Sequence, residues 1–301
     1  MSHFYDTIII GAGTAGLTAA IYTARNEKSA LVMESAGVGG QISLSPLVEN
    51  YPGFEKISGA EFSDKLYEQA LALGVELVLE EAEKIESAPD GSKVVYSEGG
   101  AVKRTCRKLI IATGQKHRKL GLAGEEKLTG RGVSYCAVCD GPFFKKKTVA
   151  VVGGGSSALQ SARLLAGLCE KVYLIHRREQ FRGEQLLAGQ LADLANVEFV
   201  LNSTVQGLEG EDKLTALTVV RTDTGAQTRL PVDGLFVYIG QLPNTEICKG
   251  VVQIDDYGYI VAAEDCRTSV PGIFAAGDCR TKSIRQLTTA AADGTVCALA
   301  D

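Results

Sequence analysis

The sequence predicts an α/β protein with two nucleotide-binding units, because two of its segments repeat one order of elements. Each segment has a short β-branched strand, a glycine cluster, a helix of small residues and a second apolar strand that ends at a charged residue. The chain has 301 residues, which suffices for about two domains with separate cores. Its 45% apolar and 22% charged residues are typical of a globular protein.

The first unit carries the glycine pattern Gly11-x-Gly13-x-x-Gly16. The first glycine permits a tight turn, the second lets the backbone approach a pyrophosphate, and the third lets the helix pack closely on the strand. Glu34 ends the second strand, where an acid binds ribose hydroxyls in such units. The expected elements are a strand over 7–10, a helix over about 17–25 and a strand over 30–33.

The second unit has Gly153-x-Gly155-x-x-Ala158, the alanine-ended form of the same pattern. Its expected elements are a strand over 148–152, a helix over about 159–168 and a strand over 172–175. Because both helices begin at the glycine cluster, each offers unpaired N–H groups and a partial positive charge to a phosphate. The sequence therefore predicts two bound nucleotides, one in each unit.

The residues that follow the second strand of the second unit indicate which nucleotide it binds. Where an NAD site places an acid, this chain has His176, Arg177 and Arg178, with Arg182 four residues later. Guanidinium groups bind phosphate in bidentate fashion, so this run favours NADP, with its 2′-phosphate, over NAD. A solvated basic face is the alternative interpretation of such a run.

Further elements are expected between and after the two units. They are an amphipathic helix over 59–74 and strands over 75–79, 93–96, 108–112, 197–201, 214–222, 228–232 and 235–239. Residues 271–278 indicate a turn, a buried strand and a tight turn. Since too few residues follow for a third domain, we expect the tail to return to the first domain. The expected domains are residues 1–112 with 243–301, and an inserted domain over 115–240.

Cys136 and Cys139 form a C-x-x-C pair. A structural zinc site needs four ligands, and the sequence has no second C-x-x-C, no zinc-type histidine pair and three histidines in total. No metal site is predicted, and a redox dithiol is favoured over two unrelated buried cysteines. The six isolated cysteines are expected to be buried thiols that pack as small apolar residues: Cys106, Cys169, Cys248, Cys266, Cys279 and Cys297.

The segment from Ser134 to Gly141, read with the HRRxxxR run and with Gly277-Asp278, resembles the low-molecular-weight thioredoxin reductases. These are NADPH-dependent, FAD-containing pyridine nucleotide-disulphide oxidoreductases. The resemblance extends from Ile8 to Gly294 in the family's order. It implies two Rossmann-like, three-layer ββα domains, with the NADPH-binding domain inserted into the FAD-binding domain.

The resemblance also implies roles for single residues. Cys139 would face the flavin, Cys136 would attack the disulfide of thioredoxin or a thioredoxin-like protein, and Asp140 would be the acid/base. Together with the glycine motifs, the expected FAD residues are Gly11, Gly13, Gly16, Glu34, Gly40, Gln41, Asn50, Thr113, Gly114, Gly277, Asp278, Arg285 and Gln286. The expected NADPH residues are Gly153, Gly155, Ser156, Ser157, His176, Arg177, Arg178 and Arg182.

Three further expectations follow from this resemblance. Phe143 and Phe144 would belong to the docking surface for thioredoxin, with core packing as the alternative. Arg285 would open a helix aimed at the flavin, with a solvated cation as the alternative. The inserted domain would rotate on links near 111–114 and 240–243, because the nicotinamide and the disulfide cannot both occupy one position against the flavin.

The predicted function is therefore reduction of a thioredoxin disulfide by NADPH, in a cytoplasmic homodimer. Alternatives are a flavoprotein of the same fold that reduces another redox protein or a small disulfide, a ferredoxin-fed reductase, and a nucleotide-binding redox sensor. The net charge of −5 argues against nucleic acid or anionic membrane as a partner. No signal peptide and no apolar run of about 20 residues is recognisable.

Overall fold

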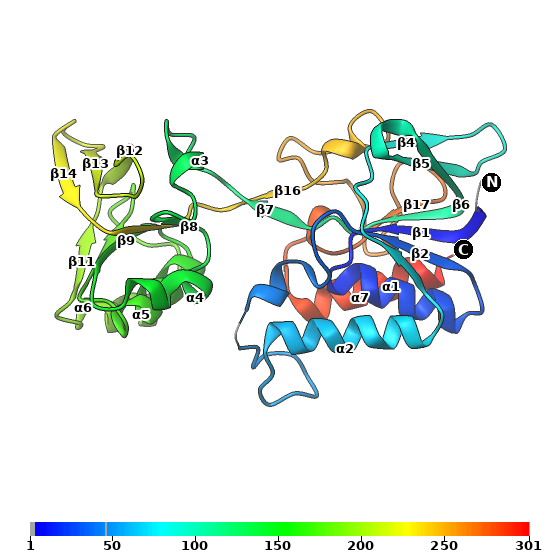
Figure 1. Cartoon of the computed structure of the whole chain (residues 1–301), viewed down its shortest axis with the longest axis horizontal. Helices are drawn as coiled ribbons and strands as arrows, with labels where there is room; N and C mark the ends of the chain where they lie inside the picture. Colours follow the sequence, from blue (N-terminus) through cyan, green and yellow to red (C-terminus); the bar gives the residue numbers. More distant parts are fainter. Residues whose placement is uncertain (1–3, 46, 301) are drawn as a thin grey trace. The chain divides into compact units, whose positions relative to one another are not determined.

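The structure is a computed structural model that describes residues 4–45 and 47–300 (Figure 1). The chain divides into two compact units, one formed by residues 1–116 and 242–301 and the other by residues 117–241. We call them the split unit and the inserted unit. Each is described by itself.

The split unit is built on a seven-stranded sheet in the order β3-β2-β1-β6-β5-β4, with β17 paired to β6. Its strands are β1 (Phe4–Ile10), β2 (Ala30–Met33), β3 (Glu76–Val78), β4 (Lys84–Ser87), β5 (Lys93–Ser97), β6 (Val102–Ile111) and β17 (Ile273–Ala275). The pairs that involve β1, β2, β3 and β17 are parallel, whereas β4, β5 and the start of β6 pair antiparallel. The apolar end of β1 is buried, as a parallel strand covered on both faces requires.

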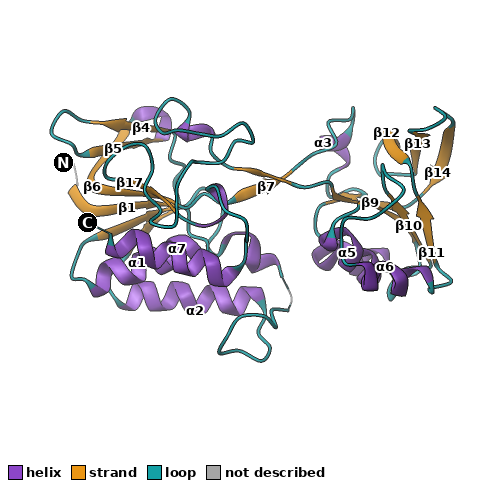
Figure 2. Ribbon diagram, turned by 180° about the vertical axis from the view of Figure 1, so that it is seen from behind, coloured by secondary structure: helices purple, strands orange, loops and turns teal. Residues whose placement is uncertain are grey.

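Two apolar layers cover the faces of this sheet. Ile9 of β1 packs with α1 (Thr14–Arg25) and with Cys297 of α7 (Leu287–Leu299), whereas Ile8 and Ile10 pack on the opposite face. Figure 2 shows α1, α7 and α2 (Gly59–Ala72) together on one side of the sheet. The β4–β5 hairpin contributes to the other layer through Ile85 and Val95. This arrangement is the three-layer fold that the sequence predicts.

The inserted unit repeats this plan. Its parallel sheet has the order β11-β10-β9-β15-β8, formed by β8 (Val133–Ser134), β9 (Thr148–Gly153), β10 (Lys171–Ile175), β11 (Val197–Val200) and β15 (Gly234–Tyr238). Val149 and Val151 face a cluster that contains residues of α5 (Ser156–Ala166) and α6 (Gln185–Ala192). Ala150 and Val152 face the antiparallel sheet β12 (Ser203–Glu209), β13 (Ala216–Arg221) and β14 (Gln227–Pro231).

Shorter elements complete the two units. They include α3 (Glu125–Leu128), α4 (Ala137–Asp140) and 3-10 turns at Gly40–Leu44, Glu98–Gly100, Gly141–Phe144, Glu246–Cys248 and Gly277–Cys279. Where the chain passes between the units, β7 (Gln115–His117) pairs with β16 (Gln241–Pro243). Gly114 and Gly240 precede these two strands with φ of 64° and 110°, and an added Cβ at either would meet open space.

The predicted α/β class with two Rossmann-like units is confirmed, and the six isolated cysteines are buried thiols as expected. Helices α1 and α5 each begin three residues before the predicted start, directly after the second glycine of their motifs. The strands β4 and β12 and the first half of β6 were not predicted. In the described part of the chain, no helix is long and apolar enough to cross a membrane.

Candidate functional site

The first glycine loop lies between β1 and α1. Gly11 has φ +107°, and a Cβ at this position would lie 2.4 Å from the carbonyl oxygen of Ala112. At Gly16 an added Cβ would lie 1.9 Å from the carbonyl oxygen of Gly11, so the helix approaches the loop too closely for any side chain. A Cβ at Gly13 would have no neighbour nearer than 3.9 Å. The loop is therefore tight at its first and third glycines and open at its second.

The N-terminus of α1 fits a pyrophosphate. Gly13 is its N-cap, no side chain caps it, and its first turn has no acidic residue. Its first-turn N–H groups and partial positive charge are thus available to an anion. Glu34 lies beside the loop, where its carboxylate accepts hydrogen bonds from Ala12 N at 2.8 Å and Ala36 N at 2.9 Å.

The turn after β17 belongs to the same region of the split unit. A Cβ at Gly277 would lie 3.0 Å from the Cβ of Ala15, so this turn packs on the start of α1. Burial raises the pKa of the Asp278 carboxyl group. The backbone carbonyl of Asp278 accepts hydrogen bonds from Gln115 Nε2 at 3.2 Å and Arg285 Nε at 3.4 Å. The half-buried Arg285 guanidinium also lies 4.1 Å from the ring centre of Tyr259.

Sequence reasoning missed the buried ion cluster that holds this turn. Asp293 accepts a hydrogen bond from Gly277 N at 2.8 Å and pairs with Arg280 at 2.7 Å and Lys282 at 2.8 Å. These hydrogen bonds and cations hold the pKa of Asp293 below its usual value although burial opposes the shift. Because Gly277 precedes Asp278, the cluster fixes an expected FAD residue. In the sequence, the signal for this ion cluster was an acidic residue, Asp293, within the small-residue helix α7.

The remaining expected FAD residues also lie in the split unit. Gln41 Nε2 donates to Gln115 O at 2.6 Å, and Asn50 Nδ2 donates to Gln286 Oε1 at 3.4 Å. Gly40 has φ +63° in the 3-10 turn that follows Gly39, whose N–H donates to Ala12 O at 2.8 Å. The Thr113 hydroxyl is buried, and among the described residues the one polar side chain beside it is the Cys279 thiol, which is a weak hydrogen-bonding group. A bound polar group beside β6 would supply the partner that buried hydroxyls normally have.

The second glycine loop lies between β9 and α5 and resembles the first. Gly153 has φ +149°, and its added Cβ would lie 2.3 Å from the Tyr238 carbonyl oxygen. Gly155 is the N-cap of α5, with no side-chain cap, no acid in the first turn and open space for a Cβ. Ser156 and Ser157 are the first two residues of this helix. This N-terminus therefore also fits a pyrophosphate.

The basic residues after β10 divide into two groups. Arg177, Arg178 and Arg182 are exposed, and in the described chain none of their guanidinium groups has an acidic partner. Such a cluster fits a phosphate. His176 instead is buried beneath Gly154, where an added Cβ would lie 2.2 Å from the imidazole ring. Burial lowers the pKa of His176, so the ring is neutral at pH 7 and supports the loop from below.

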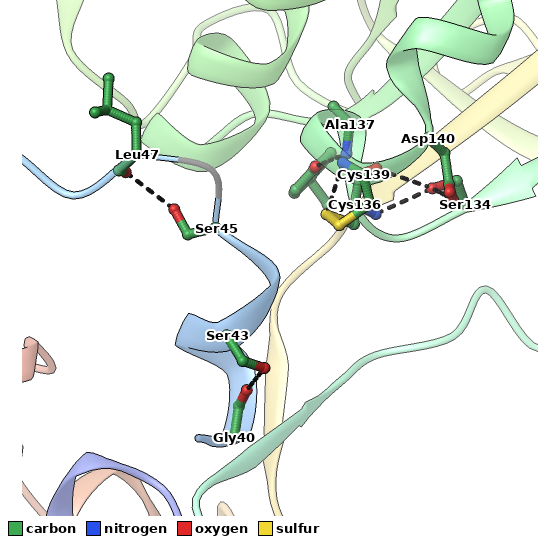
Figure 3. The surroundings of a disulfide bond; sticks show 10 residues. Gly40, Ser43, Ser45, Leu47, Ser134, Cys136, Ala137, Cys139 and Asp140 are labelled. Carbon is green, nitrogen blue, oxygen red and sulfur yellow. Dashed lines mark hydrogen bonds between the residues drawn. A yellow bond between two sulfur atoms is a disulfide. The ribbon is translucent and has the colours of Figure 1, made fainter. Parts of the chain in front are cut away.

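Cys136 and Cys139 form a disulfide with a Cα–Cα distance of 5.4 Å, at the start of α4 (Figure 3). Both residues are half-buried. Cys139 N donates to Cys136 Sγ at 3.2 Å, and Ala137 N donates to the Tyr238 hydroxyl at 2.8 Å. Tyr238 therefore contacts Ala137, which lies between the two cysteines, through its side chain and Gly153 through its backbone.

Asp140 directly follows Cys139, and Ser134 orients it. The Ser134 hydroxyl donates to Asp140 Oδ2 at 2.6 Å and accepts from Cys136 N at 3.0 Å. Figure 3 shows Ser134 and Asp140 pointing toward one another beside the disulfide.

The neighbouring phenylalanines differ: Phe143 is 73% exposed, whereas Phe144 packs on Phe236 with ring centres 5.3 Å apart. Phe144 is half-buried and packs against the core of the inserted unit, which favours the alternative of core packing for this residue.

Two dinucleotide-type loops and a Cys-x-x-Cys disulfide in one chain define the class of nucleotide-dependent disulfide oxidoreductases. The chain belongs to the pyridine nucleotide-disulphide oxidoreductase family, whose model matches residues 5–294. No group of three histidine, cysteine or acidic residues that could hold a metal occurs in the described chain.

The chain is similar to thioredoxin reductases over nearly its whole length. It is 46% identical to a thioredoxin reductase of Listeria monocytogenes, over 96% of this chain and 90% of that protein. It is 43% identical to a thioredoxin reductase of Bacillus subtilis, over 98% and 92%. A crystal structure of Lactococcus lactis thioredoxin reductase aligns with TM-score 0.90 and 39% identity, over 98% and 96%.

Proposed function

We propose that this protein is a thioredoxin-disulfide reductase, which passes electrons from NADPH through FAD to its Cys136–Cys139 pair and then to thioredoxin. The observation that carries the proposal is the half-buried disulfide beside Asp140, in a chain with two glycine loops. The similarity to thioredoxin reductases over nearly the whole chain supports the same function.

The family uses a flavin and a pyridine nucleotide, and we assign FAD to the split unit and NADPH to the inserted unit. The uncapped N-terminus of α1, Glu34 and the Gly277-Asp278 turn would hold FAD. The uncapped N-terminus of α5 and the exposed arginines after β10 would hold NADPH. A bound flavin supplies the two-electron link between a nicotinamide and a disulfide.

The reduced pair then performs thiol–disulfide exchange with the partner. The Cys136 thiolate attacks one sulfur of the partner disulfide, so the S–S bond breaks, a mixed disulfide forms and the other partner sulfur leaves as a thiolate. The Cys139 thiolate attacks Cys136 Sγ of the mixed disulfide, which reforms the internal disulfide and releases the second partner thiolate. Two electrons pass from the pair to the partner.

Asp140 is placed to move the protons of this exchange. It follows Cys139, and its N–H donates to Cys136 O at 3.1 Å, so it is tied to both cysteines. A departing thiolate is a better leaving group when a nearby acid protonates it, and a thiol becomes a nucleophile when a base removes its proton. We therefore assign Asp140 as the acid/base.

The proposal includes a change of orientation between the units during turnover. The links that precede β7 and β16 contain Gly114 and Gly240, which have positive φ and open space around them. Such positions absorb large backbone rotations. Exposed Phe143, which follows the redox helix, belongs to the thioredoxin docking surface. A cytoplasmic location and a homodimeric state complete the proposal.

A ferredoxin-fed reductase is the alternative of the same fold. It predicts a degraded second nucleotide site, but Gly153, Gly155 and the three exposed arginines are all present. A nucleotide-binding redox sensor remains the alternative outside enzymes. It predicts no steady-state turnover with any disulfide protein.

The test is NADPH oxidation in the presence of thioredoxin, measured on flavin-loaded protein. We expect Cys136→Ser and Cys139→Ser each to lower turnover by at least about 10³-fold, because the two cysteines perform different steps of the exchange and neither can replace the other. The matched control is Cys169→Ser, which changes a buried thiol of the same unit and should leave turnover within about threefold. Normal turnover in either variant of the pair would exclude the dithiol mechanism.

A further inference from the structure

Ser134 lies at the end of β8, two residues before Cys136, and the proposed function gives it no part in the thiol exchange. It is only 3% exposed, yet its hydroxyl makes contacts on three sides. It accepts from Cys136 N at 3.0 Å, donates to Asp140 Oδ2 at 2.6 Å and lies 3.3 Å from Cys136 O. No other described side chain hydrogen-bonds to the Asp140 carboxylate.

The Ser134 hydroxyl can donate one hydrogen bond and accept two, so its three contacts limit which neighbour it donates to and which it accepts from. The 2.6 Å distance to Asp140 is that of a hydroxyl donating to a carboxylate. One lone pair accepts from Cys136 N, and the second remains for another donor. Cys136 O can accept a second hydrogen bond, because a carbonyl has two lone pairs and Asp140 N occupies one.

We propose that Ser134 is a positioning residue that hydrogen-bonds Asp140 in both of its protonation states, so that Asp140 can exchange a proton without moving. When Asp140 is a carboxylate, Ser134 donates to it. When Asp140 carries a proton, its O–H donates to the free lone pair of Ser134 Oγ, and the Ser134 proton turns toward Cys136 O. No heavy atom moves, and no buried donor is left without a partner.

The inference rests on the proposed function, in which Asp140 is the acid/base of the thiol exchange. Its energetic basis is general: a catalytic group works best when a buried partner fixes its position before the reaction. Ser134 is fixed itself, because it is buried in the parallel sheet of the inserted unit, where β8 pairs with β15. The same hydroxyl ties Asp140 to the N–H of the attacking residue, Cys136.

The test is a double-mutant cycle on kcat for thioredoxin reduction by the flavin-loaded protein. Asp140→Asn should lower kcat by about 10²-fold, as expected for loss of a general acid/base. Ser134→Ala should lower kcat by about tenfold without changing KM for thioredoxin. Ser134→Ala in the Asp140→Asn background should cause no further loss, because Ser134 acts through Asp140.

Two controls make the result specific. Ser203 is a buried serine of the same unit whose hydroxyl donates to Leu201 O at 2.8 Å, so Ser203→Ala removes a comparable hydrogen bond away from the cysteines. It should leave kcat unchanged. If Ser134→Ala does not fold, Asp140→Glu tests the same bond, because it retains an acid but displaces the carboxylate from Ser134. Its kcat should also fall about tenfold.

The outcomes separate this inference from the proposed function. If the unchanged protein does not reduce thioredoxin, the proposed function fails. If it does, undiminished kcat in Ser134→Ala, or an equal further loss in the Asp140→Asn background, overturns the role of Ser134. The rate of flavin reduction by NADPH, followed in a single turnover, should be the same in Ser134→Ala and in the unchanged protein.

Discussion

The two nucleotide loops of this protein share a backbone plan and differ in what surrounds it. In both, the first glycine has positive φ and lies against a carbonyl at the end of a strand that neighbours it in the sheet, and the second is an open, uncapped helix N-terminus. They differ at the third position, where Gly16 has no room for a Cβ and Ala158 carries one. They differ again after the second strand, where Glu34 contrasts with His176 and the arginines.

This comparison separates the part of the motif that binds any dinucleotide from the part that selects one. The uncapped helix N-terminus binds a pyrophosphate, which all dinucleotides share. Selection belongs to the groups at the ribose, where a carboxylate accepts hydroxyl protons and guanidinium groups bind a phosphate. Each difference between the loops can be tested by substitution.

The largest effect is expected at the third motif position. Gly16→Ala places a methyl 1.9 Å from the backbone oxygen of Gly11, which cannot move away as a side chain could. We expect a loss of stability of about 3 kcal/mol or more, together with loss of bound flavin. The converse change Ala158→Gly should cost only about 1–2 kcal/mol, from helix propensity and a lost buried methyl. Thermal unfolding and flavin content measure both, and equal effects at the two positions would contradict the comparison.

The next effect concerns the choice of nucleotide. Arg177→Ala combined with Arg178→Ala should raise KM for NADPH by at least about 100-fold and leave KM for NADH unchanged, because each charge-assisted hydrogen bond contributes about 1.5–3 kcal/mol. Steady-state kinetics with the two nucleotides measures this. The matched control removes two exposed cations of the same unit, Lys145 and Lys146. Should that control raise KM for NADPH equally, the arginines act through net charge alone.

The smallest effect is a pH dependence at His176. Burial lowers the pKa of His176 in the folded state, so below the unfolded value of about 6.5 the unfolded chain binds a proton that the folded chain does not. Stability that is present at pH 7.5 is therefore lost as pH falls from about 6.5 toward the folded pKa. We expect His176→Gln to reduce the difference in Tm between pH 7.5 and pH 5.5 by a few degrees. An unchanged difference would mean that His176 does not titrate on unfolding.

The sequence by itself determined the two βαβ units, the paired cysteines and the basic run after the second unit. Glycine spacing and short-range periodicity report the local backbone directly, so these features could be predicted from neighbouring residues. The strands β4 and β12 were not predicted, because they pair antiparallel and lack a long apolar run.

Only the tertiary structure decided which side chain acts at each predicted position. His176 and Arg177 are adjacent in sequence, but one lies beneath Gly154 and the other is exposed. Phe143 and Phe144 divide in the same way between surface and core. The contacts of Tyr238 with Ala137 and of Asp293 with Gly277 join residues far apart in the chain. No local pattern encodes such contacts, because they form only when separate strands and helices pack together.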